Sequence, residues 1–153
     1  MYFFKDFFSN QFLITGISSW LIAQILKMAI NLVINKTFDI KRLFGDGGMP
    51  SGHSATVASL AATSALLCGM GSFEFAISAI LCIIVCNDAA GVRYETGKQA
   101  AVLNEIIGTF SVLSEEKLPG VKLKELVGHT PVQVFAGILL GLANAFFMHY
   151  IVF

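Results

Sequence analysis

The sequence predicts an all-α protein, an integral membrane bundle of about four transmembrane helices with one further amphipathic or packed helix. Hydrophobic residues make up 56% of the 153 positions and charged residues only 13%. The mean hydropathy is +0.75. A soluble domain of this size needs more charged surface. The length indicates a single domain covering residues 1–153.

Four apolar runs are the expected membrane spans, and most are long enough to cross about 30 Å of hydrocarbon. They cover residues 12–34, 54–70, 73–92 and 131–153. The second run is rich in Ala and Ser. The fourth contains Gly137 and Gly141, a pair of small residues four positions apart, which predicts close packing against another helix.

A fifth helical pattern lies between the third and fourth spans, at residues 98–113. Its apolar residues recur at helical spacing, as at Leu103, Ile106 and Phe110. Lys98 and Glu105 make it a poor spanning segment. We therefore expect this helix to pack on the bundle or to lie at the membrane interface.

Basic residues predict the orientation of the spans. The loops after the first and third spans carry Lys36, Lys41, Arg42, Arg93, Lys98, Lys117, Lys122 and Lys124. With four spans, both loops share one side of the membrane, and the positive-inside rule places that side in the cytoplasm. We therefore expect a multi-pass protein of a bacterial cytoplasmic membrane with both termini outside.

Composition also argues against some partners and sites. The net charge is zero, with ten basic and ten acidic residues, which argues against nucleic acid as a partner. The three cysteines lie in apolar segments and show neither a disulfide framework nor a metal-ligand spacing. No metal site is therefore expected. The oligomeric state stays open, with a homo-oligomer among the alternatives.

Two histidines stand at the entrances of two spans. His53 lies in "GDGGMPSGHSATVASL", residues 45–60, and His129 lies in "GHTP", residues 128–131. In the predicted topology both segments enter their spans from the cytoplasmic side. Asp88 and Arg93, in "NDAAGVR", and Lys27, in the first span, are expected at the same membrane face.

This gathering of residues predicts an anion site. Each helix N-terminus presents unpaired N–H groups and the positive end of the helix dipole. Glycines before Met49, such as Gly48, let the backbone approach a ligand closely. Together with Lys27 and Arg93, these groups suit a phosphate. Of two histidines at a phosphate, one can attack phosphorus and the other can protonate the leaving oxygen.

Four stretches in order resemble a known family. They are "LIAQILK", "GGMPSGHSATVASLAA", "NDAAGVRYETGKQAAVLNEI" and "VGHTPVQVFAGILLG". "MPSGHSA" resembles the second signature of the type 2 phosphatidic acid phosphatases, which share a helical fold with vanadium-dependent haloperoxidases. "GHTPVQVFAG" is similar to that superfamily's third signature. The whole pattern most resembles a divergent membrane branch, the acid phosphatase/vanadium-dependent haloperoxidase-related proteins.

The resemblance implies a reaction without a metal or other cofactor. It makes His129 the nucleophile, which forms a phosphohistidine, and His53 the general acid; vanadate mimics the transferred group. The residues expected to bind phosphate are Lys27, Arg42, Ser51, Gly52 and Arg93. The residues expected to support the site are Gly48, Pro50, Thr130 and Gln133.

The chain departs from the superfamily's signatures at three points. The first signature has a lysine, six residues, then Arg-Pro; here five residues separate Lys36 from Arg42, which makes Lys27 an alternative lysine. Leu123 stands where the third signature has an arginine, and Arg93 is a candidate replacement.

The third departure is Gln133, which replaces the aspartate that orients the nucleophile. A neutral amide cannot stabilise an imidazolium by charge, so Asp88 is a candidate for that role. Gln133 also has a structural interpretation, a capping box with Thr130 that is completed by Pro131 at the first helical position.

The sequence therefore favours a phosphatase that acts on a lipid phosphate at the cytoplasmic face. The main alternative is a catalytically silent membrane protein that binds a phosphorylated lipid or stabilises a partner. A small ion-coupled transporter would rest only on Lys27 and Asp88, which could also form a purely structural pair. Nothing in the sequence suggests the peroxide handling of a haloperoxidase.

Overall fold

The computed structural model describes residues 2–36, 48–113, 123, 125 and 127–153, and its elements in this part of the chain are all helical. They are α1 (Tyr2–Phe8), α2 (Gln11–Asn35), α3 (Gly52–Cys68), α4 (Phe73–Ala90), α5 (Val92–Leu113), α6 (Pro131–Phe147) and the π-helical turn η2 (Met148–Val152). The predicted all-α class is confirmed.

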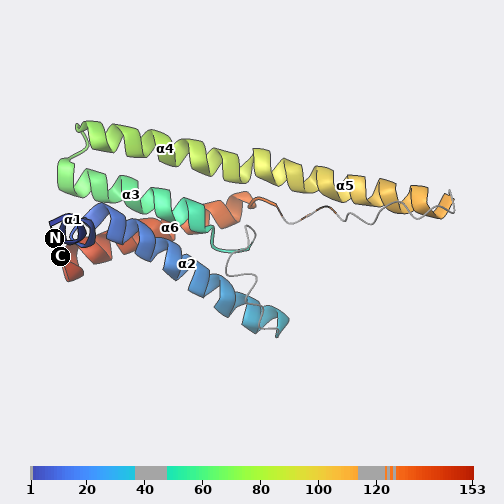
Figure 1. The fold of residues 1–153 in the computed structure, drawn as a ribbon, viewed down its shortest axis with the longest axis horizontal. Helices are drawn as coiled ribbons and strands as arrows, with labels where there is room; N and C mark the ends of the chain where they lie inside the picture. The colour runs from blue at the N-terminus through green and yellow to red at the C-terminus, as the bar shows by residue number, and fades with distance from the viewer. Residues whose placement is uncertain (1, 37–47, 114–122, 124, 126) are drawn as a thin grey trace.

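The bundle is built around α3. This helix packs against α2, α4 and α6. Helices α2 and α4 run in one direction along the long axis and α3 and α6 return in the other, so that both chain ends lie at the same end of the molecule (Figure 1). The N-termini of α3 and α6 therefore meet at the opposite end of the bundle.

Three helical segments in the described part of the chain are long and apolar enough to cross a membrane. They are Gln11–Ile34, Phe73–Phe110 and Pro131–Val152. Helix α3 has 17 residues and is therefore about 25 Å long, slightly shorter than the hydrocarbon core. It nevertheless packs against α2, α4 and α6, the helices that begin these three segments. All four predicted apolar runs form helices of this bundle.

Polar side chains set where the helices begin. Asn10, Ser51, Ser72 and Thr130 are the N-caps of α2, α3, α4 and α6, and each accepts a hydrogen bond from a backbone N–H of its own first turn. These residue types are preferred at N-caps because the side-chain oxygen satisfies an N–H that has no partner within the helix. The start of each long bundle helix is thus encoded locally.

The close contact between α3 and α6 depends on glycine. A Cβ atom at Gly137 would lie 2.5 Å from the Ser51 carbonyl oxygen, and one at Gly141 would overlap the Ala55 carbonyl and lie 2.9 Å from the Ser59 nitrogen. No side chain fits there without separating the two backbones. The predicted close packing at Gly137 and Gly141 is confirmed.

Helix α2 presents buried polar side chains to the bundle. They are Thr15, Ser19, Gln24, Lys27 and Asn31. At the end of the bundle that carries the chain termini, the Asn144 amide of α6 donates to the Ser18 and Ser19 hydroxyls at 2.9 and 2.8 Å. Hydrogen bonds of this kind hold helices together in a membrane, where the apolar faces alone give little preference for protein over lipid.

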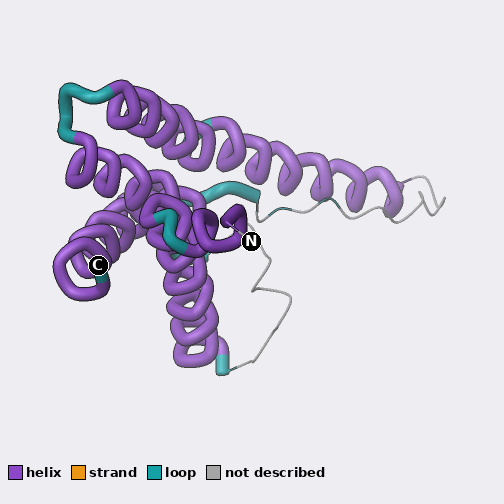
Figure 2. The backbone as a smooth tube through the Cα atoms, turned by 60° about the vertical axis from the view of Figure 1, so that its left-hand side comes forward, coloured by secondary structure: helices purple, strands orange, loops and turns teal. Residues whose placement is uncertain are grey.

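Helix α5 does not pack on the bundle. After Gly91 it continues roughly the direction of α4 and extends beyond the other helices (Figures 1 and 2). Its side chains instead hold the returning chain: the Asn104 amide bonds both the N–H and the carbonyl of Leu123 at 2.9 Å. Of the two alternatives expected from the sequence, α5 therefore does not show packing on the bundle, and a position at the membrane interface stays a prediction.

Candidate phosphate site

The two histidines of the predicted site lie together. His53 is the second residue of α3, and His129 precedes Thr130, the N-cap of α6. Their ring centroids are 6.4 Å apart and the rings are inclined by 61°. His129 is buried, at 2% exposure, whereas His53 is exposed. One imidazole is thus held in the protein and the other is accessible.

Backbone hydrogen bonds bring these segments together. The Ser51 N–H donates to the Gln133 carbonyl at 3.0 Å, which ties the start of α3 to the first turn of α6. The His129 N–H donates to the Ala89 carbonyl at 2.9 Å, which ties the α6 entrance to the end of α4. Gly128 has a φ of +85°, and a Cβ there would collide with the backbone of Arg93 and Tyr94. The tight entry to His129 therefore requires glycine.

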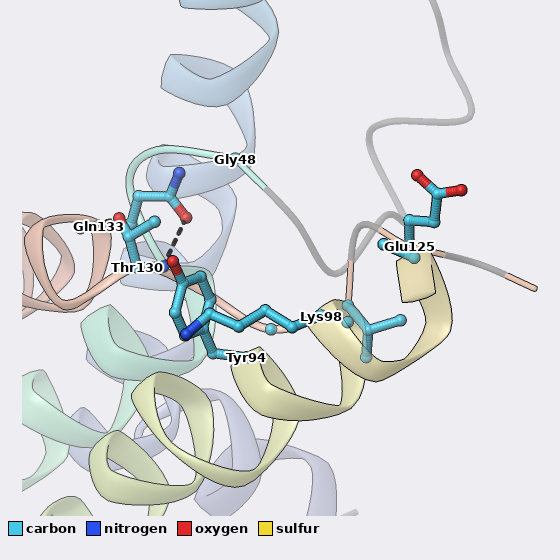
Figure 3. Close-up of a pocket in the computed structure, with 10 residues that line it drawn as sticks. Gly48, Tyr94, Lys98, Glu125, Thr130 and Gln133 are labelled. Carbon is cyan, nitrogen blue, oxygen red and sulfur yellow. Dashed lines mark hydrogen bonds between the residues drawn. The ribbon is translucent and has the colours of Figure 1, made fainter. Parts of the chain in front are cut away.

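Gln133 connects the helix cap to the His129 ring. Its side-chain oxygen accepts from the Thr130 N–H at 3.2 Å, a contact drawn in Figure 3, while Thr130 Oγ1 accepts from the Gln133 N–H at 3.4 Å. The predicted capping box is confirmed. The same Gln133 Oε1 lies 3.3 Å from His129 Nδ1. Because Oε1 can only accept, Nδ1 donates, and Nε2 carries the lone pair of the neutral ring.

The surroundings of His129 favour its neutral form. Burial lowers the pKa of His129 below its usual value, and the nearby charges of Lys27 and His53 lower it further. The Gln133 side chain and the Gly48 backbone favour the protonated ring and so act in the opposite direction, but they do not outweigh burial. At neutral pH the ring therefore has an unprotonated nitrogen.

Lys27 reaches the site from α2. Its side chain is buried, at 5% exposure, and lies under the turn that leads into α3. A Cβ at Gly48, whose φ is +99°, would be 3.2 Å from Lys27 Cγ. Lys36, in contrast, is exposed at the end of α2. Of the two lysines considered from the sequence, Lys27 is the one at the histidines. Arg42 lies outside the described residues.

Ser51 and Gly52 have structural partners in addition to the predicted phosphate contact. The fully buried Ser51 hydroxyl caps α3 by accepting from the Ser54 N–H at 3.3 Å and from the Ser54 hydroxyl at 2.9 Å. A Cβ at Gly52 would be 3.3 Å from Trp20 Cδ1, so glycine allows α2 and α3 to approach. Pro50 is buried in the turn before them. The Ser51 N–H donates to the Gln133 carbonyl, and a phosphate contact of Ser51 and Gly52 stays a prediction.

Asp88 and Arg93 form an ion pair where α4 gives way to α5. Arg93 Nε lies 2.6 Å from Asp88 Oδ2, and both side chains are roughly half exposed. The side chain that contacts the His129 ring nitrogen is that of Gln133. The structure thus brings Asp88 to Arg93 and Gln133 to His129, whereas the sequence had made Asp88 the candidate partner of the nucleophile.

A hollow of about 270 Å³ opens beside Gly48, Thr130 and Gln133 (Figure 3). Tyr94 and Lys98 of α5 line it, and the Lys98 ammonium lies 4.5 Å from the centre of the Tyr94 ring and 2.8 Å from the Glu95 carboxylate. The sequence analysis did not assign Tyr94 to the site. The signal that was available is its place in the quoted stretch around "GVRYETGK".

Gln24 is a second residue that the sequence analysis missed. Its side chain is buried, and within the described residues its Oε1 has no hydrogen-bond partner. It lies against the start of α3, because a Cβ at Gly52 would be 4.0 Å from Gln24 Cδ. Gln24 stands one helical turn before Lys27 in "LIAQILK", where the fixed spacing of the two polar residues was the available signal.

Metal-ligating side chains do not gather in the described part of the chain: no group of three His, Cys, Asp or Glu residues there could hold a metal ion. The chemical resources of the site are therefore two imidazoles, one buried ammonium and two helix N-termini, an arrangement suited to an anion.

Comparison with known proteins places this chain in a family. Residues 8–144 match the profile described as the Divergent PAP2 family. A protein of Bacillus subtilis (strain 168), named uncharacterized membrane protein YuiD, is 37% identical over 155 aligned positions, which cover 93% of this chain and 98% of the relative. No solved structure matches the chain significantly. The profile match covers both histidines, all of α2, α3 and α4 and most of α6, and the chain therefore belongs to the divergent PAP2 family.

Proposed function

We propose that the chain is a metal-independent phosphatase that acts on a lipid phosphate through a phosphohistidine on His129. The observation that carries this proposal is the pairing of a buried, neutral His129 with an accessible His53 across 6.4 Å. In this proposal, the His129 ring nitrogen attacks phosphorus from about 3–3.5 Å. His53 reaches the leaving oxygen through a proton-transfer contact of about 2.6–3.2 Å.

The first step transfers the phosphoryl group to the protein. The lone pair of His129 Nε2 forms a bond to phosphorus as the bond from phosphorus to the lipid oxygen breaks. His53, protonated at the start, gives its proton to that oxygen, and the lipid alcohol leaves. Gln133 holds the His129 ring through Nδ1, so that Nε2 faces the phosphorus.

The second step regenerates the histidine. A water oxygen bonds to phosphorus while the bond from phosphorus to Nε2 breaks, and neutral His53 takes the proton from that water. Inorganic phosphate leaves, and both histidines return to their starting forms. Lys27 and the positive ends of the α3 and α6 helix dipoles stabilise the negative charge on the phosphoryl oxygens during both steps.

The match to the divergent PAP2 family and the apolar helices support a lipid as the source of this phosphate. The site lies at an end of the bundle, where a lipid headgroup would meet the N-termini of α3 and α6 while its chain stays among the helices. We infer a multi-pass protein of a bacterial cytoplasmic membrane, with this end at the cytoplasmic face.

The orientation can be tested by cysteine labelling. In a variant without the native cysteines, Gly45→Cys and Gly120→Cys should resist a membrane-impermeant maleimide in intact cells, because the positive-inside rule places both residues inside. Gly71→Cys, in the exposed α3–α4 turn, is the control and should label. Strong labelling at residues 45 and 120 with protection at residue 71 would reverse the orientation.

The proposed activity is tested by phosphate release from a panel of lipid phosphates in the presence of EDTA. Purified protein should release inorganic phosphate and vanadate should inhibit it, whereas a His129→Ala preparation should release none. EDTA is included because the proposed mechanism uses only side chains of the protein. Equal release by both preparations would assign the activity to a contaminant.

One observation favours the alternative of a silent phosphate binder. The group at His129 Nδ1 is a neutral amide, which orients the ring but adds no charge to stabilise an imidazolium. The protein would be this silent form if it binds lipid phosphates, if vanadate displaces them, and if it releases no phosphate from any lipid of the panel.

Gln133 provides a prediction for the pH profile. Because the pKa of His129 lies below its usual value, the neutral nucleophile persists into mild acid, and the acid limb of kcat/KM should fall below about pH 6.5, the value for an unperturbed histidine. Gln133→Glu places a carboxylate at Nδ1 and stabilises the imidazolium, so the limb should move to higher pH.

Asp88→Asn is the comparison variant for that profile. Asp88 is engaged with Arg93, so its loss should leave the acid limb in place if Gln133 orients His129. A limb that moves in Asp88→Asn and stays fixed in Gln133→Glu would give the orienting role to Asp88.

A further inference from the structure

A second hollow, of about 360 Å³, lies where α2, α3 and α4 meet. Its lining comprises Gly16, Ile17, Trp20, His53, Thr56, Val57 and Val85. Most of these side chains are apolar, and His53 is the one ionisable group among them. We call this hollow the His53 groove. Its volume is within the range of about 300–1,000 Å³ that is usual for small-molecule sites.

The His53 groove lies in the part of the bundle that faces hydrocarbon. Its α2 and α4 walls belong to the candidate spans Gln11–Ile34 and Phe73–Phe110. Ile17 is 49% exposed on its rim. An apolar groove within membrane-spanning helices is open to chains from the bilayer and has little to offer a water-soluble ligand.

His53 joins this groove to the phosphate site. The same imidazole lines the groove and lies 6.4 Å from the His129 ring. The groove therefore runs from an apolar region between the helices to the histidine assigned to protonate the leaving oxygen. This continuity suits one amphiphilic molecule, with a hydrocarbon chain in the groove and a phosphate monoester between the histidines.

We propose that the His53 groove binds a hydrocarbon chain of the lipid phosphate and so positions its phosphate between His53 and His129. The inference rests on the proposed function for the location of the phosphate. The hydrocarbon chain, rather than the headgroup alone, then selects the substrate: long-chain phosphate monoesters bind and small soluble phosphates are poor ligands. The bound hydrocarbon chain places the leaving oxygen on the His53 side.

Trp20 allows chain binding to be measured without any turnover. It is the single tryptophan of the sequence and it lines the groove. In detergent, a phosphatidic acid with brominated acyl chains at a low mole fraction should quench Trp20 fluorescence saturably. Unlabelled phosphatidic acid should reverse the quenching. Phosphatidylcholine with the same brominated chains lacks the monoester phosphate and should quench only weakly.

Variants that fill the groove give the matched comparison. Val85→Phe should weaken saturable quenching at least tenfold, whereas Ile84→Phe, one residue along α4 and 59% exposed, should bind as the unaltered protein does. Gly16→Val is a second filling variant: a Cβ there would be in ordinary contact, 3.8 Å from Thr56 Cγ2, so the helix pair can accommodate it. Thermal unfolding verifies that each variant is folded.

Chain length supplies a second readout. For phosphate monoesters short enough to stay monomeric, each added methylene should tighten binding roughly fourfold until the groove is filled. Val85→Phe should shorten the chain length at which this gain stops. Affinity that is independent of chain length would overturn the groove assignment.

The outcomes separate the groove from the phosphatase. Quenching that does not distinguish the two headgroups, or that is equal in Val85→Phe and Ile84→Phe, overturns the chain site even if phosphate is released. Selective, saturable quenching that the filling variants abolish supports the chain site. If that protein releases no phosphate, the proposed hydrolysis fails while the chain site stands.

Discussion

Replacing His129 by Ala should abolish phosphate release, with a loss on the order of 10³-fold or more, as removal of a nucleophile typically causes. His129 is 2% exposed; its imidazole contacts Gln133 Oε1 and its backbone N–H donates to the Ala89 carbonyl. No second nucleophile is assigned to the site. The measurement is initial-rate phosphate release from a monodisperse preparation, beside a fold check by thermal unfolding.

His53→Asn gives the matched control, because it alters the other histidine without removing the nucleophile. Its effect should be strongest for substrates with a poor leaving alcohol and small for an activated aryl phosphate, whose leaving oxygen needs no proton. With that aryl phosphate, His53→Asn should retain acid-labile phosphate on the protein, since water attack then lacks its base. If the His129→Ala protein also retained acid-labile phosphate from the aryl phosphate, the assignment of His129 as the nucleophile would be contradicted.

Replacing Gly141 by Leu should prevent the bundle from assembling or lower its stability by about 3 kcal/mol or more, at the upper end of overpacking effects. Even a single Cβ at this position would overlap the Ala55 carbonyl and lie 2.9 Å from the Ser59 nitrogen. Both obstacles are backbone atoms of α3, which cannot turn aside as a side chain can. The measurement is thermal unfolding in detergent, followed by Trp20 fluorescence.

Gly108→Ala is the control for helical glycine. A Cβ at Gly108 of α5 has nothing within 4 Å, so alanine there should be neutral or should stabilise the helix by up to about 1 kcal/mol. Unfolding temperatures that are equal for Gly141→Leu and the unaltered protein would show that α3 and α6 do not depend on this contact. Gly137→Leu should behave as Gly141→Leu does, because its Cβ meets the Ser51 carbonyl at 2.5 Å.

The helical elements were largely predictable because their signals are local. Apolar runs of sufficient length indicate helices in hydrocarbon, and Ser51, Ser72 and Thr130 mark helix starts by a side-chain hydrogen bond within one turn. The contacts of α5 were not predictable in this way. Its apolar spacing fitted a packed helix, but a contact between Asn104 and Leu123, 19 positions apart, holds the returning chain along it.

Part of the site was predictable for the same reason. His53 and His129 each stand at the start of a helix, and the antiparallel order of the spans places both starts at one end of the bundle. The capping box was readable from Thr130, Pro131 and Gln133 because it involves neighbours in sequence. The partner of the His129 ring was not readable, because Asp88 and Gln133 were both plausible until the position of α4 was known.

The sequence by itself determined that this protein is a helical membrane bundle with two histidines at helix N-termini, since hydropathy, caps and motifs are properties of contiguous residues. The tertiary structure alone decided that Gln133 contacts His129, that Lys27 rather than Lys36 lies at the site, and that an apolar groove leads to His53. These features depend on distances between helices, which the glycine contacts of α6 with α3 and the small residues of α2 set through packing. Packing couples residues far apart in the chain, and no local pattern records it.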